Sequence, residues 1–207
     1  EEILDKIDST LLIEPRQHWY YDYLKGYVIA LKKGTTAEAF FYFNRIIDEA
    51  PKEEMEILVL LAYTGMGILY ENIGEIQKAE YFFNKAITDV YRYPIKETHD
   101  IWRLLNIMYY CGSFYANIED YQTSDALLTH GVKICSDNHV TYYLARMTFQ
   151  LAKNAVAQNK DCYEIMDLYY STKAYAEINK NMIELKALED FKHELMENDA
   201  FSEIVLY

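Results

Sequence analysis

Small and aromatic residues recur at fixed helical spacing after Gly67, and this recurrence constrains the fold more than any other feature of the sequence. Counted from Gly67, a Tyr follows at +3, a Gly at +7, an Ala at +12, a Phe at +16 and an Ala at +19. Small residues at such positions let two antiparallel helices approach closely, while Tyr70 and Phe83 fill the space between them. Gly74 falls where the chain must turn, because a positive φ costs glycine little. The segment therefore predicts a pair of helices joined by a short turn.

Weaker copies of this spacing lie before and after the segment. The copies contain Gly26, Ala39, Phe43 and Pro51; Gly112, Tyr115, Ser124, Leu128 and Gly131; and Ala152, Asn159 (at the turn), Leu168 and Ser171. Their anchors, Gly26, Gly67, Gly112 and Ala152, are separated by 41, 45 and 40 residues. Such a repeated helix pair resembles the tetratricopeptide (TPR) repeat, whose usual period is about 34 residues. The longer period here predicts elongated helices and longer loops.

The resemblance implies an all-α fold, a TPR-like right-handed superhelix of about four antiparallel helix pairs followed by a C-terminal capping helix. No strand-period alternation is sustained in the sequence. Helices are expected at about 1–9, 17–33, 36–49, 52–73, 75–91, 97–118, 120–135, 138–159, 161–178 and 180–197. We divide the chain into residues 1–14, a linker or the end of a missing N-terminal part; residues 15–179, the helical repeats; and residues 180–207, a capping helix and tail.

Composition and charge exclude several classes of function. Twenty Lys and Arg against 33 Asp and Glu give a formal net charge of −13, and a surface that negative repels nucleic-acid phosphates and anionic membranes. No apolar run is long enough to span a membrane, and no signal-peptide pattern opens the chain. Cys111, Cys135 and Cys162 fit neither a disulfide framework nor a zinc motif, which favours reduced thiols in a cytoplasmic protein. The chain starts at Glu1 rather than Met, which suggests that a natural N-terminal part is missing.

Catalytic motifs are absent from the sequence. His18 with Asp22, and His193 with Glu189 and Glu197, have i,i+4 spacing on expected helices. Two such groups could share a metal ion, but a closed or catalytic site needs three or four ligands, and a solvated ion pair is the ordinary role of such spacing. Nucleophile-elbow, phosphate-loop and dinucleotide-binding patterns do not occur. Gly65-Met66-Gly67 follows no strand and lies within an expected helix, so it is not a nucleotide loop. We therefore expect no enzymatic activity, no metal and no cofactor.

The TPR register also implies a ligand groove. In that repeat the first helix of each pair lines the concave side at set positions. Transferred to this sequence, the register gives these expected peptide-binding residues: Tyr23, Tyr27, Ile68, Asn72, Asn106, Tyr109, Asn117, Arg146, Phe149 and Lys153. Asn side chains can pair with both the N–H and the C=O of an extended peptide, and aromatic and aliphatic side chains can form apolar pockets.

Each group of groove residues also has an internal interpretation. The tyrosines can pack within the array, and the asparagines can be solvent-exposed or cap helices. Arg146 and Lys153 can hold a carboxylate of a ligand, or they can form ion pairs with a neighbouring repeat. The sequence alone leaves these alternatives open.

The pattern as a whole resembles the regulatory domain of peptide-sensing transcription regulators of Gram-positive bacteria, of the Rgg/MutR and PlcR type. The resemblance rests on the segments His18–Tyr27 and Ile73–Phe82 and on the charged terminal helix. It implies a cytoplasmic quorum-sensing protein, usually a homodimer, that binds a short signalling peptide in the groove. It also implies DNA binding through an N-terminal helix-turn-helix, which this sequence does not contain.

Two other functions are consistent with the repeats. A stand-alone TPR scaffold would bind a protein partner, with no small ligand and no role on DNA. An aspartyl-phosphate phosphatase-like sensor shares elongated repeats, but it needs an N-terminal three-helix bundle and a catalytic amide, and this chain shows no such bundle. The preferred hypothesis is the ligand-sensing regulatory domain.

Overall fold

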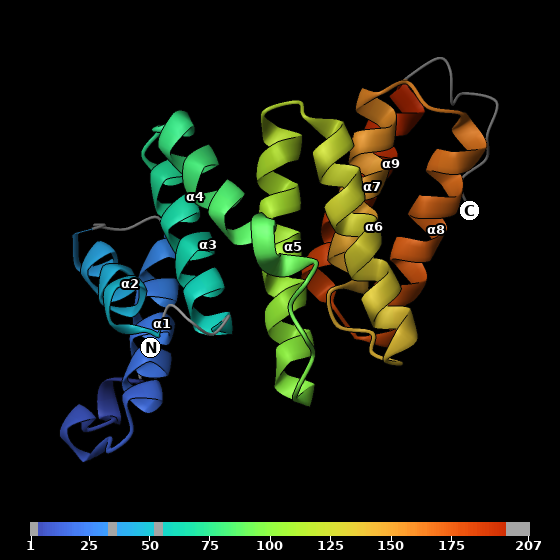
Figure 1. Ribbon diagram of the computed structural model, residues 1–207. Coiled ribbons are helices and arrows are strands. Elements are labelled where there is room, and N and C mark those ends of the chain that lie inside the picture. Colours follow the sequence, from blue (N-terminus) through green and yellow to red (C-terminus); the bar gives the residue numbers. More distant parts are fainter. Residues whose placement is uncertain (1–3, 33–36, 52–55, 198–207) are drawn as a thin grey trace. The chain divides into compact units, whose positions relative to one another are not determined.

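The computed structural model describes residues 4–32, 37–51 and 56–197 (Figure 1). Within these ranges the chain forms nine α-helices and no strand, which confirms the all-α prediction. Their bounds are α1 Pro15–Leu31, α2 Ala37–Glu49, α3 Ile57–Asn72, α4 Ile76–Val90, α5 Thr98–Asn117, α6 Tyr121–Asp137, α7 Leu144–Ala157, α8 Cys162–Ile178 and α9 Met182–Glu197. None of the described helices is long and apolar enough to cross a membrane.

Helices α1 to α4 pack against their neighbours in the chain, and so do helices α6 to α9. The pairs α1 with α2, α3 with α4 and α7 with α8 have the most extensive contacts (Figure 1). The described residues up to Cys111 form one compact unit and those from Gly112 onward form a second. We call these the N-terminal unit and the C-terminal unit, and the boundary between them falls within α5.

In the N-terminal unit, two buried phenylalanines fill the positions that the repeat spacing assigns to them. Phe43 and Phe83 are both 0% exposed. A Cβ atom added at Gly67 would lie 2.8 Å from three atoms of the Phe83 ring, so glycine is what lets α3 and α4 approach. Gly74 has φ +76° and makes the turn between these helices, as expected.

The C-terminal unit repeats the plan with one change of register. Ser124, Leu128 and Gly131 of α6 are buried at the expected positions. In α8, however, the buried residues are Ile165, Tyr169, Thr172 and Ala176, so the assignment of Leu168 and Ser171 to these packing positions is wrong. The turn that contains Asn159 is one residue longer than the Gly74 turn, and this moves every later packing position by one.

Two helix boundaries also differ from the prediction. The described part of residues 1–9 forms 3-10 turns at Leu4–Lys6 and Ser9–Leu11 in place of an α-helix, because the Asp8 carboxylate accepts the Thr10 amide and starts a new turn. Helix α7 begins at Leu144 rather than 138, since His139 and Tyr143 have positive φ values of 54° and 70°. The expected helix start at residues 52–55 lies outside the described residues.

The three cysteines are free thiols, as their spacing predicted. Cys111 and Cys135 are buried, and burial raises the pKa of the Cys135 thiol to about 12. Cys162 is partly exposed at the start of α8. We expect the native protein to show one fast thiol in a colorimetric disulfide-exchange assay. The other two thiols should react about 100-fold more slowly, because a buried neutral thiol is a poor nucleophile. Fast labelling that survives Cys162→Ser would contradict this assignment.

Candidate functional site

The first helices of the N-terminal unit bring several expected site residues together. Tyr23 and Tyr27 stack along α1, with ring centroids 5.3 Å apart. Tyr27 meets Tyr110 of α5 edge-on at 5.8 Å, and Tyr110 contacts the neighbouring ring of Tyr109 at 5.1 Å. Tyr110 was not among the expected site residues, although it is adjacent to one of them. We call these four residues the tyrosine cluster.

Asn106 of α5 is part of the same arrangement. Its side chain is 0% exposed, and its Nδ2 donates a hydrogen bond to the Tyr27 hydroxyl at 2.7 Å. Asn72 is exposed at the end of α3, and its Nδ2 donates to the Ala30 carbonyl in the last turn of α1 at 2.8 Å. That contact adds a side-chain donor to a carbonyl in the last turn of the helix, where the regular i to i+4 donors run out. Both amide groups therefore join α1 to a later helix.

The expected residues differ in how far a ligand could reach them. Tyr23 is fully buried and Ile68 is 6% exposed, so both side chains lie among the packed helices and offer a ligand little surface. Tyr20, one turn before Tyr23, is 39% exposed. The guanidinium of Arg103 lies 5.4 Å from the centroid of the Tyr20 ring, a cation–π arrangement, and Arg103 also pairs with Asp100 at 3.2 Å. Arg103 was missed by the sequence analysis, although it precedes Asn106 by one helical turn.

In the C-terminal unit, α7 carries three expected residues on one face, and α5 ends with Asn117, which is exposed. Arg146 forms an ion pair with Glu184 of α9 at 3.2 Å, which is the internal role considered for it. Phe149 is 8% exposed and meets Phe191 of α9 edge-on at 5.4 Å. The Phe149 ring in turn lies under the Lys153 ammonium, 4.8 Å away.

The charge of Lys153 is affected by this apolar neighbourhood. Desolvation lowers the pKa of its ammonium below the ordinary value, and the carboxylates of Glu184 and Glu194 oppose that shift. A lysine desolvated beside an aromatic ring gains more from an incoming carboxylate than a fully solvated one. Among the residues that the structure describes, no three His, Cys, Asp or Glu side chains are placed to hold a metal ion.

The architecture defines the class: antiparallel helix pairs that repeat one set of small and aromatic contact positions, as in TPR-like proteins. No family model matches the sequence, and no curated protein matches it. A solved structure with a similar fold is that of Bacillus thuringiensis PlcR in complex with the peptide PapR7 and DNA. The TM-score is 0.73 at 14% sequence identity, and the match covers 90% of this chain and 67% of that chain. The match confirms, at the level of the fold, the resemblance to PlcR-type regulators.

Proposed function

We propose that this chain is the ligand-sensing regulatory domain of a cytoplasmic transcription regulator, and that it binds a short peptide on the face formed by the first helices of its pairs. The observation that carries the proposal is the likeness to PlcR, because it spans 90% of this chain and PlcR was crystallised with a peptide and DNA. DNA binding would belong to an N-terminal helix-turn-helix domain that precedes these residues. The working assembly would be a homodimer.

The chemistry of the first-helix face supports a peptide as the ligand. Within the tyrosine cluster, the half-buried Tyr27, Tyr109 and Tyr110 offer ring surface for apolar side chains and hydroxyl groups for backbone contacts, while Tyr23 supports them from the buried layer. Asn72 is exposed, and its Oδ1 accepts no hydrogen bond from the described residues, so this oxygen can accept a peptide N–H. In the C-terminal unit, taken by itself, Lys153 beside Phe149 provides a cation next to an apolar surface, a combination that suits a carboxylate with an apolar neighbour.

A peptide on this face could change the array through contacts that already join its helices. The Asn106–Tyr27 and Asn72–Ala30 hydrogen bonds tie α1 to α5 and α3. A ligand shifts such an equilibrium only by binding one arrangement more tightly than the other. A peptide that binds beside Tyr27 and Asn72 would therefore favour the arrangement in which those hydrogen bonds are made.

The test is affinity selection of random apolar heptapeptides on the whole chain, followed by calorimetric titration of the selected peptide. Asn72→Ala should weaken binding by about 1 kcal/mol, since the hydrogen bond from a peptide N–H to Asn72 Oδ1 is lost. The matched control is Asn44→Ala, an exposed asparagine on α2, which should leave the affinity unchanged. Equal affinity of wild type and Asn72→Ala would contradict this assignment of the binding face.

A stand-alone TPR scaffold is the second candidate, and one observation favours it. Asn72 and Asn106 donate within the chain, and Arg146 is paired with Glu184, so these three side chains have internal roles without any ligand. The scaffold predicts that the selection yields no peptide and that the chain captures a folded protein partner. Recovery of a peptide that binds the first-helix face would decide against it.

A further inference from the structure

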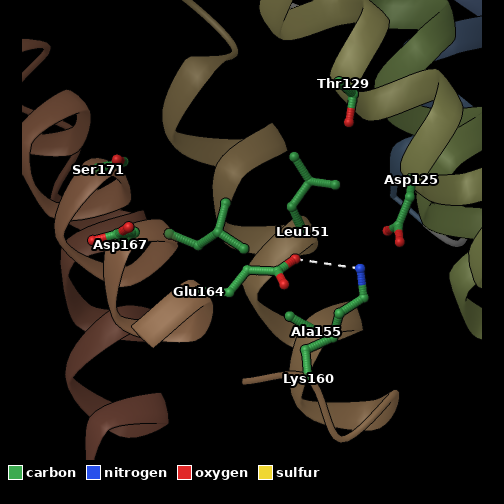
Figure 2. A pocket seen from close by; sticks show the side chains of 9 residues that line it. Asp125, Thr129, Leu151, Ala155, Lys160, Glu164, Asp167 and Ser171 are labelled. Carbon is green, nitrogen blue, oxygen red and sulfur yellow. Dashed lines mark hydrogen bonds and ion pairs between the residues drawn. The ribbon is translucent and has the colours of Figure 1, made fainter. Parts of the chain in front are cut away.

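A hollow of about 540 Å³ lies in the C-terminal unit between α6 and α8, with α7 as its floor. Figure 2 shows its two sides and the floor between them. The residues that matter for its chemistry are Asp125 and Thr129 of α6, Leu151 and Ala155 of α7, and Asp167 and Ser171 of α8. These helices are the α6–α7–α8 part of the array, and none of the expected peptide-binding residues lines the hollow.

The equivalent space in the N-terminal unit, between α2 and α4 above α3, is filled by aromatic rings. Phe40 of α2 packs on Tyr70 of α3 with ring centroids 4.9 Å apart. Tyr70 stacks on Phe82 of α4 at 5.4 Å, with an interplanar angle of only 7°. The Lys78 ammonium lies over the Tyr70 ring at 5.5 Å, so a cation covers this stack.

The repeat register shows which residues replace these rings. Three buried positions align the helices α2, α3 and α4 with α6, α7 and α8. Phe43 corresponds to Leu128, Gly67 to Ala152, and Phe83 to Tyr169. At equal distances from these positions, Asp125 takes the place of Phe40, Ala155 that of Tyr70, and Leu168 that of Phe82. Three rings are thus replaced by a carboxylate, a methyl group and an isobutyl group. We attribute the hollow to this loss of side-chain volume.

The charge around the hollow differs as well, because its lining contains three acidic side chains, Asp125, Glu164 and Asp167, and one cation, Lys160. Glu164 takes the position of Lys78, and Asp167 that of Tyr81. The Asp125 carboxylate is held in place at the edge of the hollow by the amides of Asn154 and Gln158 at 2.8 and 2.9 Å. Glu164 is paired with Lys160 at 3.2 Å. Asp167 is exposed and makes no hydrogen bond or ion pair with the described residues.

We propose that this hollow is a docking site for a segment of a partner protein that carries an aromatic side chain next to an arginine or lysine. The ring would occupy the volume that Tyr70 and Phe82 fill in the N-terminal unit, and the cation would meet Asp167 and Asp125. The chain's own residues 198–207 do not supply this occupant, because they contain Asp199 and Glu203 but no Lys or Arg. The site is separate from the first-helix face and does not depend on peptide sensing.

The test uses fluorescence anisotropy with the whole chain and two labelled hexapeptides, Gly-Ser-Trp-Arg-Ser-Gly and its Trp-Glu counterpart. The Trp-Arg peptide should bind at least about tenfold more tightly, which corresponds to about 1.4 kcal/mol. Ala155→Phe, which returns a ring to the hollow, should weaken binding by about tenfold. Asp167→Asn should weaken it by about threefold, and because Asp167 is exposed this variant is expected to fold.

The matched control is Asp190→Asn on α9, which makes the same change in net charge at an exposed residue outside the hollow. It should leave the affinity for the Trp-Arg peptide unchanged. Equal binding of the two peptides, or no binding of either, would overturn the proposal. So would equal losses in Asp167→Asn and Asp190→Asn, which would mean general attraction to an acidic protein. Competition by spermidine at the concentration at which the peptide binds would assign the hollow to a free polyamine instead of a protein.

Discussion

Gly65→Ala is expected to lower the free energy of unfolding by about 3 kcal/mol, because the new methyl group would overlap a buried ring. A Cβ atom at Gly65 would lie 2.6 Å from both Cε1 and Cε2 of Phe43, and closer still to Cζ. Phe43 cannot retreat easily, since a Cβ at Gly26 of α1 would also lie 2.9 Å from the same ring. The Phe43 ring of α2 thus contacts a glycine of α1 and a glycine of α3 at the same time. Urea unfolding followed by circular dichroism at the helix band would measure the loss.

A double-mutant cycle distinguishes this overlap from a general loss of helix stability. Phe43→Leu alone should destabilise by about 1–2 kcal/mol, since it shortens a buried side chain. In the Gly65→Ala/Phe43→Leu protein the overlap is relieved, so the combined loss should be smaller than the two single losses added. Gly74→Ala is a useful comparison. No atom lies within 4 Å of its added Cβ, and its cost of about 1 kcal/mol would come from the positive φ alone. Strict additivity in the Gly65–Phe43 cycle would contradict the packing account.

The helix pairs could be predicted from sequence because their contacts are local and steric. A small residue facing a large one at fixed spacing needs no knowledge of the rest of the chain, and Gly67 with Phe83 illustrates this. The role of Gly65 could not be predicted in the same way, because it receives Phe43 from the preceding pair. Spacing within one pair carries no information about contacts between pairs. The register of α8 was missed for a related reason, since one added residue in a turn leaves helical periodicity intact.

The candidate site was less predictable than the fold. The repeat register selects residues on the first helix of each pair, but it does not identify the hydrogen-bond partners of those residues. Asn106 bonds to a tyrosine 79 residues earlier in the chain, and Asn72 to a carbonyl 42 residues earlier. Partners so distant in sequence depend on how α1 packs against α3 and α5. The spacing of His18 and Asp22 was equally uninformative about their partners, since the His18 ring nitrogen lies 2.9 Å from the Leu12 carbonyl and Asp22 pairs with Arg45 of α2.

Arg45→Met is expected to destabilise the protein by about 3 kcal/mol at neutral pH, because it leaves the buried carboxylate of Asp22 without its partner. Asp22 is 0% exposed, and it accepts hydrogen bonds from Arg45 Nε at 2.5 Å and from Arg45 Nη2. The expected loss is at the low end for a broken buried pair, since the Arg45 side chain is 34% exposed. Arg92→Met, at an exposed arginine of the same unit, should change the stability by less than about 0.5 kcal/mol.

The pH dependence of Arg45→Met identifies the carboxylate as the cause. Burial already raises the pKa of Asp22 above its ordinary value in the folded protein, even though the Arg45 hydrogen bonds lower it. Removing Arg45 should raise that pKa further. As the pH rises, the folded variant then keeps the proton on Asp22 after the unfolded chain has already released it. Stability contributed by this proton is present below the unfolded pKa of Asp22 and is lost as the pH rises toward the folded pKa. The difference in unfolding free energy between wild type and Arg45→Met should therefore be smallest in acid and grow toward neutral pH.

The double variant Asp22→Asn/Arg45→Met has no carboxylate to titrate at this position. It should recover part of the stability and lose this pH dependence. If Arg45→Met is equally destabilised at all pH values, its effect comes from lost side-chain packing and not from an unpaired charge.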